Sequence, residues 1–179
     1  MDKHFNENPV VSMRNISKSF GDKKVLSNVD FDLHKSEVHA LLGENGAGKT
    51  TLMNILYGMF PPSDGTITIN GKTYTSMTPK MAIDAGIGMV HQHFMLIEPL
   101  TVTENIILGY EEDTGLFLDR KTAREKIENL SKEYGLMIDP DARVEDITVG
   151  QQQRVEILKA LYRGADILIF DEPTAVLTP

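Results

Sequence analysis

Alternating apolar and polar positions predict β-strands in the first third of the chain. Every second residue from Val29 to Leu33 is apolar and aspartates lie between them, which is typical of a strand with one buried face. Ile67 and Ile69 repeat this alternation directly before an Asn-Gly pair. Both residues of that pair tolerate the positive φ angles of a tight hairpin turn. We therefore expect antiparallel β structure in this part of the chain.

Two nearly continuous apolar runs, 38–42 and 167–170, predict a second kind of strand. Such runs are typical of central strands that are buried on both faces of a sheet. Each run ends directly in a cluster of polar residues. Ligands of open α/β sheets bind beyond the carboxyl ends of the strands, so we expect the functional residues at these two ends.

A helix is predicted between these two runs by apolar residues at helical spacing. Ala123, Ile127, Leu130 and Tyr134 follow each other at i, i+4, i+7 and i+11, which places them on one stripe of a helix. Gly135 is a plausible stop signal for this helix. The predicted buried stripe of this helix therefore consists of all four apolar residues.

A second helix is marked by Val155, Leu158 and Tyr162, with an end near Gly164. We interpret the region of roughly 94–164 as a helical subdomain inserted into a nucleotide-binding core. The core would comprise roughly 8–93 and 165–179. With the phosphate-binding motif G-x-x-x-x-G-K-[ST] at 43–50, the expected fold class is α/β: a P-loop NTPase core with an N-terminal antiparallel β-subdomain and this helical insertion.

Composition narrows the class of protein without naming a function. The 179 residues are 41% hydrophobic and 25% charged, with a formal net charge of −8, so the acidic balance argues against a nucleic-acid partner. Cysteine is absent, which excludes disulfides and thiolate chemistry. No apolar run approaches the roughly 20 residues that span a bilayer. The polar start lacks the apolar stretch of a signal peptide, so we expect a cytoplasmic protein.

The segment 43–50 matches the phosphate-binding motif G-x-x-x-x-G-K-[ST] at every specified position. Glycines let successive backbone N–H groups turn toward the phosphates, and the following helix directs its positive end at them. Lys49 would reach the β- and γ-phosphates, and the Thr50 hydroxyl would ligate Mg²⁺. The alternative is a glycine-rich turn without a ligand. The predicted ATP-binding residues of this loop are Gly43, Asn45, Gly46, Ala47, Gly48, Lys49, Thr50 and Thr51.

Two carboxylates, Asp171 and Glu172, end the apolar run 167–170. An unpaired carboxylate is costly on a buried strand, so a purely structural role for both is awkward. In P-loop ATPases an acid at this position helps to hold Mg²⁺, which suits Asp171. Glu172 would then be the general base that activates the attacking water. A solvated acidic turn after the strand is the alternative.

The order of these motifs, with a signature-like segment between them, resembles the nucleotide-binding domain of ATP-binding-cassette (ABC) transporters. The resemblance covers nearly the whole chain. In this family the signature contacts the γ-phosphate held by the phosphate loop of a partner domain, which predicts a head-to-tail pair. The sequence departs from the common Leu-Ser-Gly-Gly-Gln form, since Ile147 and Val149 replace leucine and the first glycine. The predicted signature residues are Thr148, Gly150 and Gln151, and Thr148 is equally suited to be a helix N-cap.

Further site residues are implied by the resemblance. Gln92 matches the glutamine that contacts Mg²⁺ or the attacking water, so its predicted role is both catalytic and metal-binding. Lys49 is likewise predicted to be a catalytic residue. Phe20 matches the aromatic residue that stacks on adenine, and Val25 is a further predicted ATP-binding residue. Gln92 and Phe20 could each instead be a packing residue. His91 and His93 flank Gln92 and could share one face of a strand as metal ligands. No third ligand is suggested nearby, so the glutamine interpretation is preferred.

Within the family, the sequences of the motifs are similar to those of importers of simple sugars and nucleosides. They resemble the first of the two ATPase domains of these importers. Thr178 occupies the position of an aspartate found in many relatives. None of the five histidines follows Glu172, so the family's switch histidine is missing. We therefore interpret 1–179 as a single, incomplete domain, truncated at the C-terminus and poorly active in isolation.

The resemblance implies an ATP- and Mg²⁺-dependent ATPase that energises solute import. Its partners would be a second ATPase domain, transmembrane permease subunits and, indirectly, an extracytoplasmic solute-binding protein. It would lie peripherally on the inner face of the cell membrane. Three alternatives remain: a relative acting on ribosomes or DNA, a nucleotide-dependent module without turnover, and a generic P-loop kinase or GTPase. The guanine-reading Asn-Lys-x-Asp motif of the last class is absent.

Overall fold

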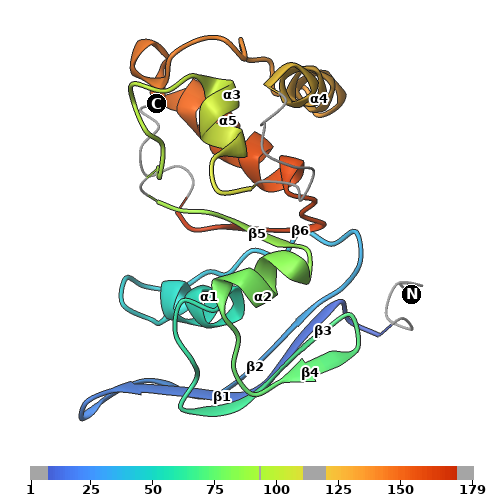
Figure 1. Cartoon of the computed structure of the whole chain (residues 1–179). Helices are drawn as coiled ribbons and strands as arrows, with labels where there is room; N and C mark the ends of the chain where they lie inside the picture. Colours follow the sequence, from blue (N-terminus) through green and yellow to red (C-terminus); the bar gives the residue numbers. More distant parts are fainter. Residues whose placement is uncertain (1–7, 93, 111–119, 173–179) are drawn as a thin grey trace. The chain divides into compact units, whose positions relative to one another are not determined.

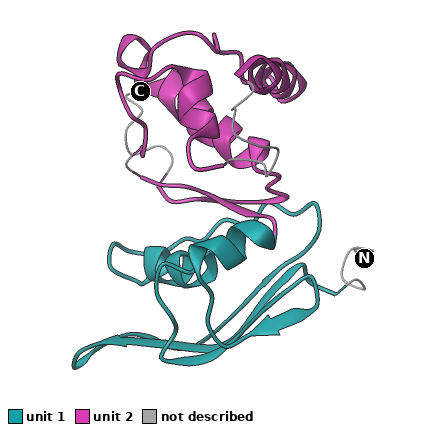
Figure 2. Cartoon of the chain, viewed as in Figure 1, with its two compact units in different colours: residues 1–85 teal, residues 86–179 magenta. Residues whose placement is uncertain are grey.

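A computed structural model describes residues 8–92, 94–110 and 120–172 of the chain. The chain divides into two compact units, residues 1–85 and 86–179 (Figure 2). Each unit has its own secondary structure and its own buried residues. Among the described residues, no helix is both long enough and apolar enough to cross a membrane.

The first unit contains a four-stranded antiparallel sheet with the order β2-β1-β3-β4 (Figure 1). The antiparallel β structure that alternation predicts for this region is therefore confirmed. The bounds are β1 Val11–Phe20, β2 Lys23–Leu33, β3 Asp64–Ile69 and β4 Lys72–Tyr74.

The sheet buries one apolar face through strands β1 and β3. Val11, Met13 and Ile67 are fully buried, and Met13 lies opposite Ile67 in the ladder. Asn70 and Gly71 connect β3 to β4 with φ angles of 48° and 81°, as the Asn-Gly hairpin signal predicts. The alternation thus predicted strands β2 and β3, and the Asn-Gly pair predicted the turn after β3.

Two helices accompany this sheet in the first unit: α1 Lys49–Tyr57 and α2 Pro79–Asp84. The helix expected after the phosphate loop is confirmed as α1, which buries Leu52, Ile55 and Leu56. Its end at Gly58 has a φ of 85°, and an added Cβ would lie 2.5 Å from backbone atoms of Thr78. Glycine is therefore required here both by conformation and by space.

The second unit begins with a parallel pair of strands, β5 Ile87–Val90 and β6 Ile167–Phe170. Val90 pairs with Phe170, so both strands end at the same edge. The predicted strand at 167–170 is confirmed, but its burial on both faces is not, since Phe170 is 42% exposed. Gly88 lets the C-terminal helix of this unit approach, because an added Cβ would lie 2.7 Å from Ala160.

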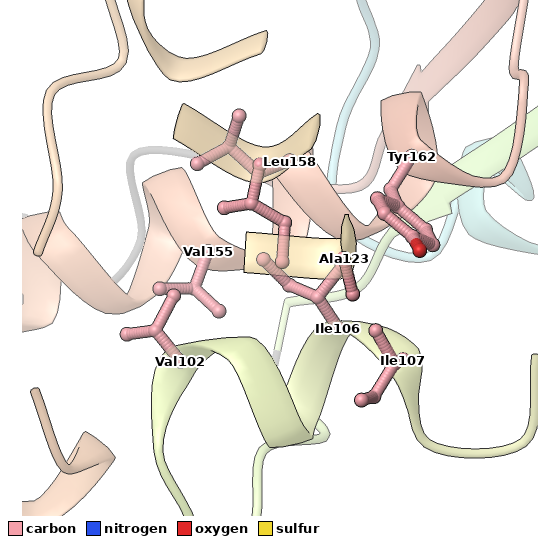
Figure 3. Packing of buried hydrophobic residues seen from close by; sticks show 8 residues of the cluster. Val102, Ile106, Ile107, Ala123, Val155, Leu158 and Tyr162 are labelled. Atoms are coloured by element: carbon pink, nitrogen blue, oxygen red, sulfur yellow. The ribbon is translucent and has the colours of Figure 1, made fainter. Parts of the chain in front are cut away.

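Helical elements occupy the chain between these strands. They are α3 Val102–Ile107, α4 Arg120–Glu133, the 3₁₀ helix η1 Val144–Asp146 and α5 Val149–Tyr162. The apolar stripes predicted for α4 and α5 meet α3 in one core cluster (Figure 3). The buried members are Val102, Ile106, Ile107, Ala123, Ile127, Val155, Leu158 and Tyr162.

Two details of the sequence-based expectation are wrong. Residues 38–42 form no strand, and Val38 and Leu42 are 98% and 91% exposed. An apolar run shows a preference for burial, but a strand exists only through hydrogen bonds to a neighbouring strand. Tyr134 is likewise 53% exposed, because α4 ends at Glu133 before the stripe reaches it. The predicted division into a core and a helical subdomain at 94–164 stays a prediction.

Candidate nucleotide-binding site

The phosphate loop lies in the first unit, between residue 43 and the start of α1. Gly46 and Gly48 have φ angles of 84° and 93°, a region that side chains other than glycine rarely adopt. Gly48 is also restricted by space, since an added Cβ would lie 2.6 Å from Leu26 Cδ2 and 3.4 Å from the Val25 carbonyl oxygen. The motif glycines thus meet a real conformational requirement, and β2 lies against the loop.

The ammonium group of Lys49 is held by the loop itself. Lys49 Nζ donates hydrogen bonds to the carbonyl oxygens of Gly43 and Glu44, at 2.8 and 2.9 Å. The cation therefore lies within the loop, where it can neutralise a bound phosphate. The loop also closes on itself through a 3.2 Å hydrogen bond from Ala47 N to the Glu44 carbonyl.

The N-terminus of α1 is suited to an anion. Gly48 is the N-cap of this helix and provides no side-chain hydrogen bond, and the first turn carries no acidic residue. The first N–H groups of a helix have no intrahelical acceptor, and the helix dipole adds positive potential there. Thr50, in this first turn, is exposed. The arrangement fits a phosphate group with a metal-binding hydroxyl beside it.

Two predicted site residues of the second unit are brought together across 80 positions of the sequence. Gln92 follows β5 and Glu172 follows β6, and Gln92 Nε2 donates a hydrogen bond of 3.1 Å to Glu172 Oε2. The parallel pairing of β5 with β6 explains this meeting, because parallel strands end at the same edge. Asp171 is anchored there by a 3.1 Å hydrogen bond from its N–H to the Val90 carbonyl.

Glu172 has an uncommon backbone conformation for a residue with a side chain. Its φ angle is 47°, in the left-handed region. Strained conformations of this kind persist where the surrounding structure determines them, and they cluster at functional sites. The Glu172 side chain is exposed and available to a substrate or to water.

Each predicted Mg²⁺ ligand carries a donor of the type that Mg²⁺ prefers. The first unit offers the Thr50 hydroxyl, and the second unit offers the Asp171 carboxylate and the Gln92 amide oxygen, all hard oxygen donors. Among the described residues, no group of three or more His, Cys, Asp and Glu side chains could hold a metal by itself. His93, one half of the alternative histidine pair, lies outside the described residues, as does Thr178.

The predicted base-stacking residue Phe20 lies at the end of β1. Its side chain is 48% exposed and packs edge-to-face on Phe60, with 5.3 Å between the ring centroids. Lys18 Nζ lies 5.1 Å from the centroids of both rings. An exposed ring face of this kind is suited to stacking, but it is equally a packing contact, so the role of Phe20 stays a prediction.

The signature-like segment forms the start of α5. Thr148 is the N-cap, and its Oγ1 accepts a 3.3 Å hydrogen bond from Gln151 N. Gln151 Oε1 in turn accepts a 2.9 Å hydrogen bond from Thr148 N, which completes a capping box. Val149 is 45% exposed, so the residue that replaces glycine is accommodated. An added Cβ on Gly150 would meet nothing within 4 Å.

Glu156 and Lys159 of α5 are two residues that the sequence motifs did not single out. Glu156 is only 5% exposed and accepts a hydrogen bond from the backbone of Met95, in the segment after Gln92. The signal was present, because a glutamate directly beside an apolar stripe of a helix requires a polar partner. The partner itself could not be found without the tertiary structure.

A glycine loop before α1, a signature-like start of α5 and a strand β6 that ends in two carboxylates follow one another along the chain, in the order expected of an ATP-binding cassette. A model of the ABC transporter family matches residues 26–175, and the chain belongs to this family. The match supports ATP as the nucleotide that the chain binds. The predicted resemblance and the predicted fold class are both confirmed.

The relatives with similar sequences are ATP-binding proteins of importers. The nucleoside import ATP-binding protein NupA of Lactococcus lactis is 61% identical over 95% of this chain and 34% of its own length. The guanosine import ATP-binding protein NupO of Bacillus subtilis is 55% identical, over 95% of this chain and 33% of its own. The ribose import ATP-binding protein RbsA of Streptococcus agalactiae is 47% identical, over 94% and 34%. The chain thus spans about a third of the length of these curated relatives.

Solved structures of cassettes share the fold. The ADP conformation of MJ1267, an ATP-binding cassette of an ABC transporter, has a TM-score of 0.83 and 26% identity. That match covers 97% of this chain and 72% of the solved one. The cbiO1 structure from Clostridium perfringens, part of the transporter complex cbiONQ, has a TM-score of 0.78 and 28% identity, over 97% and 69%.

Proposed function

We propose that this chain binds Mg-ATP and hydrolyses it to energise the import of a nucleoside or a simple sugar through a membrane permease. The observation that carries the proposal is the phosphate loop, in which Lys49 Nζ is bound to two backbone carbonyls of the loop before an α1 N-terminus that has no side-chain cap. The transported class is supported by the names of the relatives, which are nucleoside, guanosine and ribose import proteins.

In the proposed reaction, the residues of the first unit bind and polarise the phosphates. The glycines direct backbone N–H groups at the phosphate oxygens, and Lys49 neutralises charge on the β- and γ-phosphates. Phe20 and Val25 would contact the adenosine. Mg²⁺ would neutralise charge on the phosphates, held on this chain by the Thr50 hydroxyl, the Asp171 carboxylate and the Gln92 amide oxygen.

The residues at the ends of β5 and β6 would activate water. Glu172 accepts a proton from the attacking water molecule. The oxygen of that water forms a bond to the γ-phosphorus, while the bond between this phosphorus and the ADP oxygen breaks. The hydrogen bond from Gln92 to Glu172 leaves the second carboxylate oxygen of Glu172 to accept this proton. The unusual backbone conformation of Glu172 supports a role that requires a defined direction of this side chain.

The complete site would need a second ATPase domain. Thr148, Gly150 and Gln151 at the start of α5 would contact the γ-phosphate held by the partner domain, where the helix N-terminus favours an anion. The permease would supply the membrane spans and the solute-binding protein would act outside, while this chain lies peripherally on the inner membrane face. No nucleic acid is part of the proposed function.

The test is the Glu172→Gln variant of the full-length polypeptide that carries this sequence. We expect ATP turnover to fall by roughly 10²–10⁴-fold, the usual contribution of a general base, while ATP binding is retained. Glu125→Gln on the exposed face of α4 makes the same chemical change and should leave turnover intact. Unchanged turnover of Glu172→Gln would mean that this ATPase domain is regulatory, and loss of binding would point to a structural role.

A further inference from the structure

The second unit contains a buried carboxylate that the proposed reaction does not use. Glu156 lies on α5 and is 5% exposed. A buried charge is costly unless its oxygens are paired and hydrogen-bonded. Both oxygens of Glu156 have partners, and both partners lead to the segment that follows Gln92.

The partners form a clamp around one backbone residue. Glu156 Oε1 accepts a 2.7 Å hydrogen bond from Met95 N, and Lys159 Nζ donates a 3.3 Å hydrogen bond to the Met95 carbonyl. The clamp is closed by an ion pair of 3.7 Å between Lys159 Nζ and Glu156 Oε2. We call Glu156 and Lys159 the Met95 clamp. Burial lowers the pKa of Lys159, and the charge of Glu156 opposes this shift.

Polar contacts to its backbone, and not burial of its side chain, hold Met95 in place. The Met95 side chain is 64% exposed, whereas the next residue, Leu96, packs against the core cluster. Two residues further on, Asn105 of α3 repeats the arrangement: its Oδ1 accepts from Ile97 N at 2.7 Å, and its Nδ2 donates to the Ile97 carbonyl at 3.0 Å. The backbones of Met95 and Ile97 are therefore held by side chains of two helices, α5 and α3.

The clamp lies close to Gln92 along the chain. Val90 is fixed in the β5–β6 ladder and Met95 is fixed by the clamp, so Gln92 lies in a short connection anchored at both ends. The three residue steps from Gln92 to Met95 reach at most about 11 Å when fully extended. A displacement of Met95 therefore changes where the Gln92 side chain can reach.

The other end of the same helix carries the signature-like segment. Glu156 follows Thr148, the N-cap of α5, by eight residues, which is about 12 Å along a helix axis. Val155 and Leu158 flank Glu156 and are fully buried in the core cluster (Figure 3). A helix anchored in this way moves as one body, so the signature end and the clamp move together.

We propose that Glu156 and Lys159 are positioning residues that hold Gln92 against Glu172 through the backbone of Met95. The clamp links the signature end of α5 to the residue pair that activates water. This inference rests on the proposed function, because it assigns a mechanical connection within the same site. Neither clamp residue needs to touch nucleotide.

The first test is a double-mutant cycle on ATP turnover in the full-length polypeptide. We expect Glu156→Ala to lower kcat by about ten- to hundredfold, as displacement of a positioned group does, with the KM for ATP changed less than about twofold. Glu156→Gln retains an oxygen for Met95 N and should recover part of the rate. In a Gln92→Ala background, Glu156→Ala should add less than about a twofold loss, because both changes act through the same group.

A merely structural role gives different results. The inference would be overturned if the fold-losses in kcat of the two single variants multiplied in the double variant, or if Glu156→Ala had the kcat of the wild type. Glu125→Ala on the exposed face of α4 is the matched control for removing a glutamate from a helix.

The second test does not depend on turnover. Amide hydrogen exchange over residues 94–101 should be accelerated by Glu156→Ala relative to Glu125→Ala, and unchanged exchange would overturn the clamp. If Glu172→Gln leaves turnover unchanged, the proposed function fails, and the exchange measurement still decides whether the clamp exists.

Discussion

Replacing Gly48 with alanine should destabilise the phosphate loop much more than the same replacement at Gly46, two residues earlier. Both glycines have positive φ angles, 93° and 84°. They differ in their surroundings: an added Cβ on Gly48 lies 2.6 Å from Leu26 Cδ2, and one on Gly46 meets nothing within 4 Å. The pair therefore separates backbone strain from steric overlap.

The magnitudes follow from these two contributions. A left-handed conformation costs alanine about 1–2 kcal/mol, and this cost applies to both variants. Leu26 is 5% exposed, so its side chain cannot move into solvent. Overpacking of a buried site adds about 1–3 kcal/mol. We therefore expect about 2–5 kcal/mol for Gly48→Ala and about 1–2 kcal/mol for Gly46→Ala.

Peptide-resolved amide exchange across β2 and α1 of the full-length polypeptide measures this difference locally. Each 1.4 kcal/mol of lost local stability appears as about tenfold faster exchange in the bimolecular regime. Because Gly48 caps α1, the same variant should weaken ATP binding by displacing the first amides of the helix. Equal exchange in the two variants would refute the steric argument, and the assignment of Leu26 as the obstacle would fail with it.

Two further predictions concern the second unit. The N–H of Thr101 donates to the Glu104 carboxylate and lowers its pKa from the ordinary value of 4.5, with the Thr101 hydroxyl and nearby arginines acting in the same direction. This stabilisation of α3 is present above about pH 4.5 and is lost as the pH falls through the lowered pKa of Glu104. Glu104→Gln should therefore reduce the dependence of amide exchange in α3 on acidic pH. An unaltered pH dependence would exclude Glu104 as the source of this stabilisation. Ile106→Ala removes a fully buried core side chain and should lower the free energy of unfolding, measured with a chemical denaturant, by about 2–5 kcal/mol. Tyr134→Ala changes a side chain that is 53% exposed and should change this free energy by no more than about 0.5 kcal/mol. Similar losses in the two variants would contradict the assignment of Ile106 to the core.

The sequence alone identified the local structure around the phosphate loop. Its glycines, lysine and threonine have a fixed spacing that belongs to a glycine turn at the start of a helix, and helix α1, Lys49–Tyr57, follows the loop. The Asn-Gly turn after β3 was predictable for the same reason. In both places the required φ angles are properties of single residues, so neighbours in sequence carry the information.

Partner-dependent features were not accessible in this way. Residues 38–42 have the composition of a buried strand, yet they form no ladder in the described part of the chain and Val38 is 98% exposed. Tyr134 continues an apolar stripe but lies beyond the end of α4. The hydrophobicity of a segment indicates only that its burial is favourable. Strand pairing and side-chain packing also need a surface that another segment of the chain must provide.

Sequence by itself determined the class of this protein, because the phosphate loop, the acidic pair and the signature segment are each short and have local requirements. Tertiary structure decided how distant residues meet. Only the parallel pairing of β5 with β6 brings Gln92 to Glu172 across 80 positions. Only the packing of α5 brings Glu156 to Met95 across 61 positions. Hydrogen bonds between such distant groups depend on strand register and helix packing, which no local pattern encodes.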